Sequence, residues 1–404
     1  MILWLFTYIF LGMAPFVQQA LGIEPSTTAG LRAEFFAPAV AVVIIGAFAA
    51  MAGSFWAGRA KRGADYIGRI VVTSRANLLA VAALALGAYY GNKVGFGTFI
   101  GSRTDLSLAR ESAWSQSAVS GLMTGALNMG LLVAFVSQMH LRSQAKLEGR
   151  PGPLFLPLVT GVALLFFVNP VSSARYVFGT VILGMLACFG AYKTVKRYRF
   201  FAGASIVGMV TLFPLADAFR HSTSVEIKAE STLESLTSGD FDAFAQIVNT
   251  MDYVAERGIS WGEQILGVIF VWVPRSWWPD KPIDTGTVLA EYKGYGFTNI
   301  SSPLWSELFI NGGWAVLVIG MVLAGYYFRV SDIRGERALI VSSIPPVAVC
   351  IIPFYLLIVL RGSLLNATSS LIVIVLCSWF VTQKQPERAP AASGGNSTRD
   401  VASN

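Results

Sequence analysis

Long apolar runs separated by short polar stretches dominate the hydrophobic pattern of this chain. A run of about 20 apolar residues is long enough to cross the hydrocarbon core of a bilayer as a helix. The pattern predicts about ten such helices, at residues 2–22, 35–57, 70–91, 118–140, 154–169, 177–192, 200–219, 303–327, 338–360 and 364–382. We therefore expect an all-α membrane protein whose residues 1–382 form one transmembrane bundle.

The longest polar stretch, about residues 220–302, interrupts the apolar runs as a single long loop. Within it, DFDAFAQIVNTMDYVAERG repeats apolar residues at helical spacing, with Asp240 as the expected N-cap and Gly258 as the expected stop. This amphipathic helix either lies on the membrane surface or covers a cavity mouth. The apolar segment ILGVIFVWV at 265–273 is too short to span, which predicts a re-entrant or interfacial position.

The sequence also predicts the structure of the two ends of the chain. The N-terminus lacks a basic region and a small-residue cleavage site, so we interpret it as the first spanning helix and not as a signal peptide. Residues 383–404 are rich in Pro, Ala, Ser, Gly and Asn, which predicts a disordered tail. Glycines within the apolar runs are expected to let helices approach closely.

Charge adds the orientation. Only 13% of residues are charged, against about 25% in soluble domains. Basic residues cluster in alternating short loops at 59–75, 142–150, 193–199 and 329–337, and in the tail. The positive-inside rule places these loops and both termini in the cytoplasm, and the long loop outside the cell (inner) membrane. The net charge of +7 is thus a topology signal, and no nucleic-acid partner is expected.

Metal and redox chemistry find little support in the sequence. Cys188, Cys350 and Cys377 all lie in apolar runs without disulfide or metal-ligand spacing. The two histidines, His140 and His221, are too few and too far apart for a zinc site. We expect no metal and no cofactor.

Several cations break the charge rule on the predicted outer face. Arginine binds phosphate through its planar fork of donors, so these residues suggest a polyanionic ligand at the outer surface. The ordinary alternative for any one of them is a side chain at a helix end that reaches for the headgroups. The residues are Arg175, Arg220, Arg275, Lys281 and Arg361. Among them Arg275 has the most rigid setting, because its segment VPRSWWPDKP is rich in proline and tryptophan.

Two carboxylates lie in or beside predicted outer helix ends. Glu307 opens one spanning helix and Asp217 ends another. A carboxylate at membrane depth is costly, so each is either a functional group or the partner of an arginine. As a functional group, either is a candidate general base toward a hydroxyl. His221 is a further candidate base, although a lone histidine beside Arg220 is more often a surface residue.

At PRSWWPDKPIDTG the chain resembles the bacterial O-antigen and exopolysaccharide polymerases, the Wzy-type oligosaccharide repeat-unit polymerases. That family is described by an outer-loop arginine followed, after ten residues, by glycine, and Arg275 and Gly286 have this spacing; Arg175 has Leu186 at the matching place. Further similar segments follow in order from about residue 169 to 366: NPVSSARYVFG, FPLADAFR, GDFDAF, VPRSWWPDKP, NISSPLWSELFINGG and LRGSLL.

The resemblance implies a GT-C-like glycosyltransferase bundle and a metal-independent transfer of glycan. The donor is an undecaprenyl-diphosphate-linked oligosaccharide and the acceptor is another lipid-linked repeat unit, which yields O-antigen, capsule or exopolysaccharide. On this interpretation Arg175, Arg275 and Arg361 hold the diphosphate, supported by Arg220, Lys281 and Gly286, and Glu307 or Asp217 is the base. A flippase and a chain-length regulator are the implied protein partners.

Two alternatives remain open at this point. An O-antigen-ligase-type enzyme would move finished glycan to a different acceptor, usually with an outer-loop histidine, for which His221 is the candidate. A flippase or transporter for lipid-linked glycans would place charge along the full depth of the bundle. Most charge in this sequence lies at the two predicted faces, which favours an enzyme that works on one side.

Overall fold

The computed structural model describes residues 2–60, 69–114, 116–191, 193–194, 196–197, 200–201, 203–204, 208, 234–298, 300–341 and 344–384. The predicted helix at 200–219 therefore lies largely outside the described residues, and so does the tail from residue 385. The other nine predicted apolar runs are helical at the expected places.

The apolar helices follow the predicted order along the chain. The first run consists of α1 (Ile2–Tyr8), a π-helical turn η1 (Ile9–Met13) and α2 (Ala14–Leu21). The others are α3 (Phe36–Ala60), α4 (Thr73–Val94), α6 (Ser117–Leu147), α7 (Phe155–Phe167), α8 (Arg175–Cys188), α13 (Leu304–Val341), α14 (Val347–Arg361) and α15 (Leu364–Val381).

Five segments in the described part of the chain are long and apolar enough to cross a membrane. They are Ile2–Leu21, Ala33–Ala60, Val119–Leu147, Leu304–Leu339 and Leu364–Val381. Helices α7, α8 and α14 are apolar but shorter. The protein is therefore a mostly helical membrane protein.

The boundary between α13 and α14 differs from the prediction. Helix α13 continues to Val341, well past the predicted end at 327, because its polar last turns contain no proline and are rich in residues that tolerate a helix. Helix α14 begins only at Val347, since Pro345 and Pro346 precede it and proline disfavours helical backbone in the residue before it. Residues 338–341, assigned by sequence to the second helix, belong to the first.

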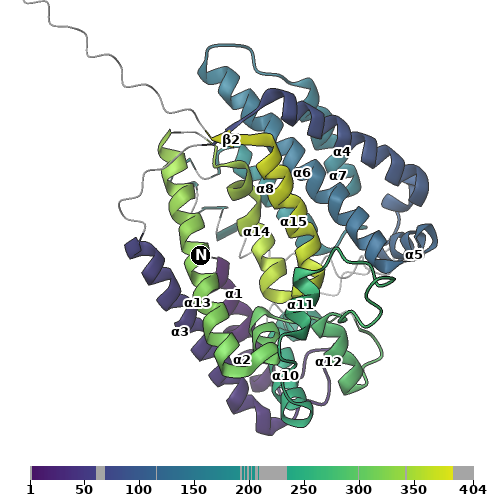
Figure 1. The fold of residues 1–404 in the computed structure, drawn as a ribbon, viewed down its shortest axis with the longest axis vertical. Coiled ribbons are helices and arrows are strands. Elements are labelled where there is room, and N and C mark those ends of the chain that lie inside the picture. The colour runs from purple at the N-terminus through teal and green to yellow at the C-terminus, as the bar shows by residue number, and fades with distance from the viewer. Residues whose placement is uncertain are drawn as a thin grey trace, which may run out of the picture.

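Buried side chains form two main hydrophobic cores. One lies among α4, α6, α7, α8, α14 and α15. The other lies among α1, α2, α3 and α13, together with the loop helix α10 (Ala243–Arg257). Helix α14 lies between the two groups, because it packs against α8 and α15 and also against α1 (Figure 1).

Helices α3 and α13 pack closely through small residues, as their glycines predicted. A side-chain carbon at Gly53 would overlap the Val322 carbonyl, and one at Gly325 would overlap the Ala50 carbonyl. The Ser54 hydroxyl donates a hydrogen bond to the Gly325 carbonyl at 3.1 Å. Such contacts are available only to residues without side chains, so the two backbones meet directly.

The bundle has two distinct ends, visible in Figure 1. At the ribbon end, β1 (Arg69–Val71) pairs antiparallel with β2 (Thr382–Lys384). At the loop end lie α10, α11 (Glu263–Ile269) and α12 (Thr285–Lys293). The sequence did not predict the ribbon, and β2 contains Gln383 and Lys384, which the sequence pattern assigns to the disordered tail.

Smaller elements are α5 (Arg103–Ala113), η2 (Ala33–Phe35), η3 (Phe96–Phe99), η4 (Glu234–Thr237) and η5 (Gly239–Phe241).

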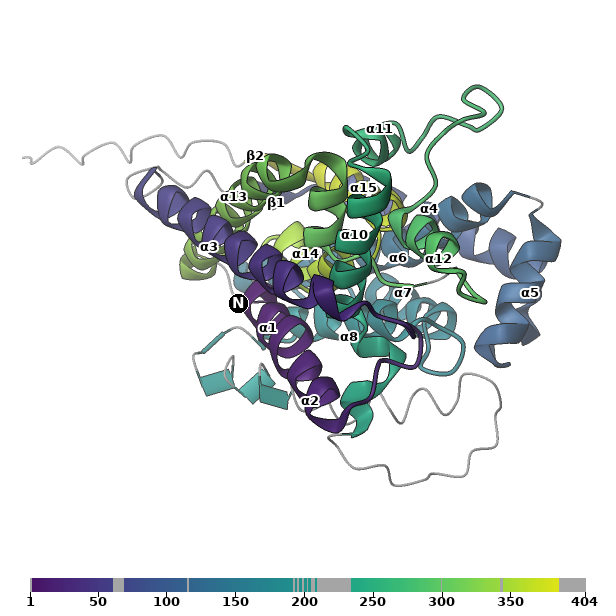
Figure 2. The same ribbon diagram turned by 90° about the horizontal axis from the view of Figure 1, so that it is seen from below.

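The predicted amphipathic helix exists as α10 and covers the loop end. Its apolar residues Phe244, Ile247 and Val248 are buried against the second core. Figure 2 looks at this end and shows α10 lying between α3 and α12. The helix ends at Gly258 as expected, but Asp242 occupies the N-cap position in place of Asp240 and makes no side-chain capping bond. Asp240 has another partner, described next.

Candidate functional site

The segment Gly239–Asp242 lies between two predicted outer-face arginines. Arg175, the first residue of α8, forms an ion pair with the Asp240 carboxylate. Both side chains are largely buried, at 11% and 14% exposure. An arginine at the start of a helix is unfavourable to the helix dipole, so the neighbouring carboxylate offsets a local electrostatic cost.

Arg361, the last residue of α14, reaches the same segment. Its guanidinium donates to the Asp242 carboxylate at 3.0 Å, and to the backbone carbonyls of Gly239 and Asp240, each at 2.9 Å. It also lies over the ring of Tyr176, 5.0 Å from the ring centroid. Asp242 is 1% exposed, so this charge pair is held away from bulk solvent.

Glu307 is buried near the start of α13, close to these arginines but not paired with them. Its carboxylate accepts hydrogen bonds from the Thr285 hydroxyl at 2.8 Å and from the Leu364 N–H at 3.1 Å. Leu364 is the first residue of α15, so the carboxylate lies at the positive end of that helix. No ion pair among the described residues includes Glu307. Glu307 is therefore not the ion-pair partner of any arginine that the structure describes.

The residues that precede α13 join Glu307 to the arginine pair. The Ser302 N–H donates to the carbonyl of Arg361 at 3.0 Å, and the Ser301 N–H donates to the Asp242 carboxylate at 3.3 Å. Through this segment Arg175, Arg361 and Glu307, which are far apart in sequence, lie at one end of the bundle. We call Arg175, Asp240, Asp242, Glu307 and Arg361 the charged cluster.

A break in α13 sets the position of Glu307. Gly313 has φ 59° and ψ −145°, a conformation that is essentially restricted to glycine. The helix is interrupted there, and the Ile310 carbonyl instead accepts a hydrogen bond from the Ser260 N–H at 2.8 Å. Glu307 thus belongs to a short separate helical piece at the loop end, which the loop itself holds in place.

Unpaired polar atoms surround the charged cluster. In the described part of the chain, the hydroxyls of Ser301 and Ser306, the Gln246 amide nitrogen and the Asn249 amide oxygen are buried without a hydrogen-bond partner. A buried polar group of this kind costs about 1–3 kcal/mol. Four such groups on α10 and at the start of α13 indicate a region that meets water or a polar ligand.

Arg275 and Lys281 occupy a different position from the other predicted phosphate ligands. The exposed Arg275 guanidinium donates to the carbonyls of Lys281 and Pro282 at 2.6 and 3.2 Å. The Lys281 ammonium donates to the carbonyls of Val271 and Val273 at 2.8 and 3.0 Å. Burial, and secondly the charge of Arg275, lower the pKa of Lys281. In the described residues, these two cations brace their own loop and make no hydrogen bond to the charged cluster.

Gly286 has a packing reason to be glycine. A side-chain carbon there would lie 2.7 Å from the carbonyl of Ile300, so α12 begins in direct contact with the segment leading into α13. The same start of α12 supplies Thr285 to Glu307. The substrate-binding role predicted for Gly286 stays a prediction, as do those of Asp217, Arg220 and His221, which lie outside the described residues.

A second polar cluster, centred on Asp252, joins α10 to neighbouring segments. The Asp252 carboxylate, 2% exposed, accepts from Arg32 at 2.9 Å, from Lys293 at 3.1 Å and from the Tyr292 hydroxyl at 3.0 Å. Burial and the nearby carboxylates raise the pKa of Tyr292. These bonds tie α10 to α12 and to the connection before α3, so we interpret them as structural.

Sequence reasoning missed the two aspartates of the charged cluster. The sequence pattern predicts a helix cap at Asp240 and no role for Asp242. Both lie in GDFDAF, one of the segments that resemble the polymerases, so the signal was present in the sequence. Comparison with protein-family models, curated proteins and solved structures found no match to this chain. The site therefore rests on its own geometry.

Proposed function

We propose that this protein polymerises lipid-linked oligosaccharide repeat units into surface polysaccharide at the loop end of the bundle. The observation that carries the proposal is the convergence of Arg175, Arg361 and Glu307 at that end, beside buried polar groups without partners. Arginines suit a diphosphate leaving group, a carboxylate suits proton removal, and unpaired hydroxyl and amide groups suit sugar hydroxyls.

The proposed topology follows from the charge pattern. We place the loop end on the outer face of the inner membrane and the ribbon end, with both termini, in the cytoplasm. The proposed fold is a GT-C-like bundle of about ten spans, in which the shorter α7, α8 and α14 also cross the bilayer. A helix shorter than the hydrocarbon core is accommodated at modest cost by local thinning of the bilayer or by neighbouring helices.

In the proposed reaction an acceptor sugar hydroxyl attacks the anomeric carbon of the donor glycan. A new glycosidic bond forms, and the bond from that carbon to the diphosphate oxygen breaks. Arg175 and Arg361 exchange their aspartate partners for the diphosphate and stabilise its charge as undecaprenyl diphosphate leaves. Glu307 takes the proton from the acceptor hydroxyl. The Thr285 hydroxyl, which donates to this carboxylate, must give up its hydrogen bond before an acceptor hydroxyl can take its place.

Exposed aromatic residues support delivery of a lipid-linked substrate to this end. Trp261, Trp272 and Trp277 are 85%, 69% and 79% exposed. They lie around α11 and the loop that Arg275 braces, where aromatic rings favour the headgroup region of a bilayer. In the proposed topology the short apolar segment at 265–273 takes the interfacial one of its two expected positions, so that polyprenyl chains of the outer leaflet pass close to the charged cluster.

The test is chain growth by purified protein from an undecaprenyl-diphosphate-linked repeat unit, followed on gels. We expect Glu307→Gln to slow polymerisation by about 10²–10⁴-fold, the usual contribution of a general base. Arg361→Lys should also fail, because lysine offers a point charge without the bidentate fork. Arg150→Lys at the ribbon end, whose side chain is 70% exposed, is the matched control and should polymerise normally.

Three results would contradict the proposal. Wild-type rates in Glu307→Gln, with the variant folded as judged by size-exclusion chromatography, would remove the proposed base. A protein that moves lipid-linked glycan between leaflets of vesicles without lengthening it would be a flippase. If glycan instead appears on a different acceptor in one step, the protein is a ligase-type transferase.

A further inference from the structure

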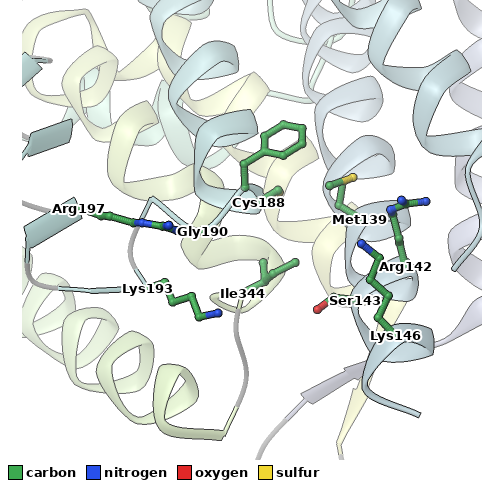
Figure 3. Close-up of a pocket in the computed structure, with 10 residues that line it drawn as sticks. Met139, Arg142, Ser143, Lys146, Cys188, Gly190, Lys193, Arg197 and Ile344 are labelled. Atoms are coloured by element: carbon green, nitrogen blue, oxygen red, sulfur yellow. The ribbon is translucent and has the colours of Figure 1, made fainter. Parts of the chain in front are cut away.

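A hollow of about 410 Å³ lies at the opposite end of the bundle from the charged cluster. Its walls are the last turns of α6, the residues that follow α8, and Ile344 from the connection between α13 and α14. Figure 3 shows Ser143 on α6 and Lys193 beyond α8 pointing toward the space between these walls. The proposed polymerisation makes no use of this hollow.

The charge of the lining is one-sided. Among the lining residues that the structure describes, none is acidic and four are cations: Arg142, Lys146, Lys193 and Arg197. Arg142 and Lys146 are one helical turn apart on α6, where two like charges repel. The nearest carboxylate in sequence, Glu148, forms an ion pair with Arg150 and does not line the hollow.

Helix ends do not account for this concentration of charge. Helices α6 and α8 both end near the hollow, and each C-terminus carries about half a negative charge. Together they offset about one of the four positive charges. The remaining positive charge of the lining is available to an anion from outside the chain.

The cations also retain donors. In the described residues, the Lys146 and Lys193 ammonium groups take part in no ion pair or hydrogen bond. Arg142 uses one nitrogen for the carbonyls of Pro153 and Gly152, at 3.2 and 3.4 Å, which leaves its other terminal nitrogen available. A phosphate group has enough acceptor oxygens to engage all of these donors at once.

Apart from Ser143, the remaining side chains of the lining are apolar, and they lie at the edge of a membrane-crossing segment. Met139, Cys188 and Ile344 form the apolar part, and Phe189 beside them is 64% exposed. Helix α6 contains the candidate span Val119–Leu147, so the hollow lies where headgroups meet acyl chains. Basic pockets between transmembrane helices with this composition suit phosphate-bearing headgroups.

We propose that this hollow is a binding site for a phosphate group, carried by an anionic phospholipid of the adjacent leaflet or by a soluble phosphate. The four cations hold the phosphate oxygens, and the apolar wall with Phe189 receives the glycerol and upper acyl chain when the source is a lipid. The site joins three segments that are otherwise separate in sequence, so its ligand also ties the ribbon end together.

The test uses the full-length protein in detergent and counts bound ligand by native mass spectrometry. The probes are phosphatidylglycerol, zwitterionic phosphatidylcholine and inorganic phosphate, each added separately. Lys146→Gln/Lys193→Gln should weaken phosphatidylglycerol binding about thirtyfold, from about a fivefold loss per cation. Lys146→Arg/Lys193→Arg keeps the charge and should keep binding. Lys196→Gln, exposed nearby but outside the lining, is the matched control and should bind as the wild type does.

Each outcome decides the proposal. Tight phosphatidylglycerol binding that the double glutamine variant loses supports a lipid source, and inorganic phosphate binding with the same dependence supports a soluble one. Equal binding of phosphatidylglycerol and phosphatidylcholine, or no binding of any probe, overturns the proposal. It is also overturned if Lys196→Gln weakens binding as much as the double variant, because the effect is then general surface charge.

Discussion

At the residue scale, the charged cluster shows how buried arginines are kept in a membrane protein. Arg361 has the carboxylate of Asp242, two backbone carbonyls and the face of Tyr176 around it. All of these partners carry negative charge or partial negative charge. The guanidinium is therefore held in one orientation by partners from the protein itself.

Removing the Asp242 charge should destabilise the protein. Asp242→Asn leaves Arg361 with carbonyl partners alone, and breaking a buried ion pair costs about 3–5 kcal/mol. We expect a clear fall in Tm, measured by thermal unfolding in detergent. Glu256→Gln is the control, because that carboxylate lies on the same helix, also pairs with an arginine and is 51% exposed; its Tm should hardly change. An equal fall in Tm for the two variants would show that the buried Arg361–Asp242 pair stabilises the protein no more than the exposed pair does.

At the element scale, the broken helix α13 is the feature that brings Glu307 to the site. Its first piece faces the loop end, and its longer second piece packs against α3. The break lies at adjacent glycines, and only Gly313 has a positive φ. Loop residue Ser260 supplies the hydrogen bonds that the interrupted helix lacks.

Alanine at Gly313 should strain this break. Its conformation is sterically unfavourable for any residue with a side chain, at a cost of about 1–3 kcal/mol. Gly313→Ala should lower Tm and also reduce polymerisation, since a shift of the first piece moves Glu307. Gly121→Ala, at an exposed helical position with open space, is the control, and its Tm should be equal or slightly higher. An unchanged Tm in Gly313→Ala would mean that the break relaxes without cost.

At the scale of the whole molecule, charge separates the two ends. The ribbon end gathers basic segments, including the lining of the phosphate hollow and Arg69, which donates to the Thr382 hydroxyl at 2.9 Å. The loop end holds the acidic partners Asp240, Asp242 and Asp252. This polarity is what the positive-inside rule requires if the loop end faces outward.

Cysteine accessibility checks that orientation. In a variant whose three native cysteines are replaced by alanine, single cysteines at Asp280 and Arg150 report on the loop end and the ribbon end, and both positions are exposed. A membrane-impermeant maleimide should label Asp280→Cys in intact spheroplasts and Arg150→Cys only after lysis. Reversed labelling would invert the topology and place the charged cluster in the cytoplasm.

Much of the fold was predictable because long apolar runs have few alternatives to helices. The amphipathic pattern around Phe244 and Ile247 gave α10 and its buried face for the same reason. The ribbon was not predictable, since Arg69–Val71 and Thr382–Lys384 are short and depend on each other across nearly the whole chain. The extension of α13 to Val341 was missed because hydropathy falls there while helix propensity continues.

The site was predictable in its residue types and not in its pairings. Arg175 and Arg361 stood out because a cation at an outer helix end contradicts the positive-inside rule, and Glu307 because a carboxylate at membrane depth is costly. Which carboxylate meets which arginine depends on how α8, α14 and the segment Gly239–Asp242 approach in three dimensions. For Glu307 the sequence left a functional group and the partner of an arginine as alternatives, and it did not indicate the Thr285 hydroxyl and Leu364 N–H that the carboxylate meets.

The close contact of α3 with α13 has a consequence for biosynthesis. Helix α3 is complete at Ala60, but its partner begins only at Leu304. At roughly 5–20 residues per second the ribosome needs about ten to fifty seconds to bridge that interval. During this delay the glycine-lined groove of α3 is open to lipid or to the insertion machinery. Assembly of this half of the protein is therefore a late event in translation.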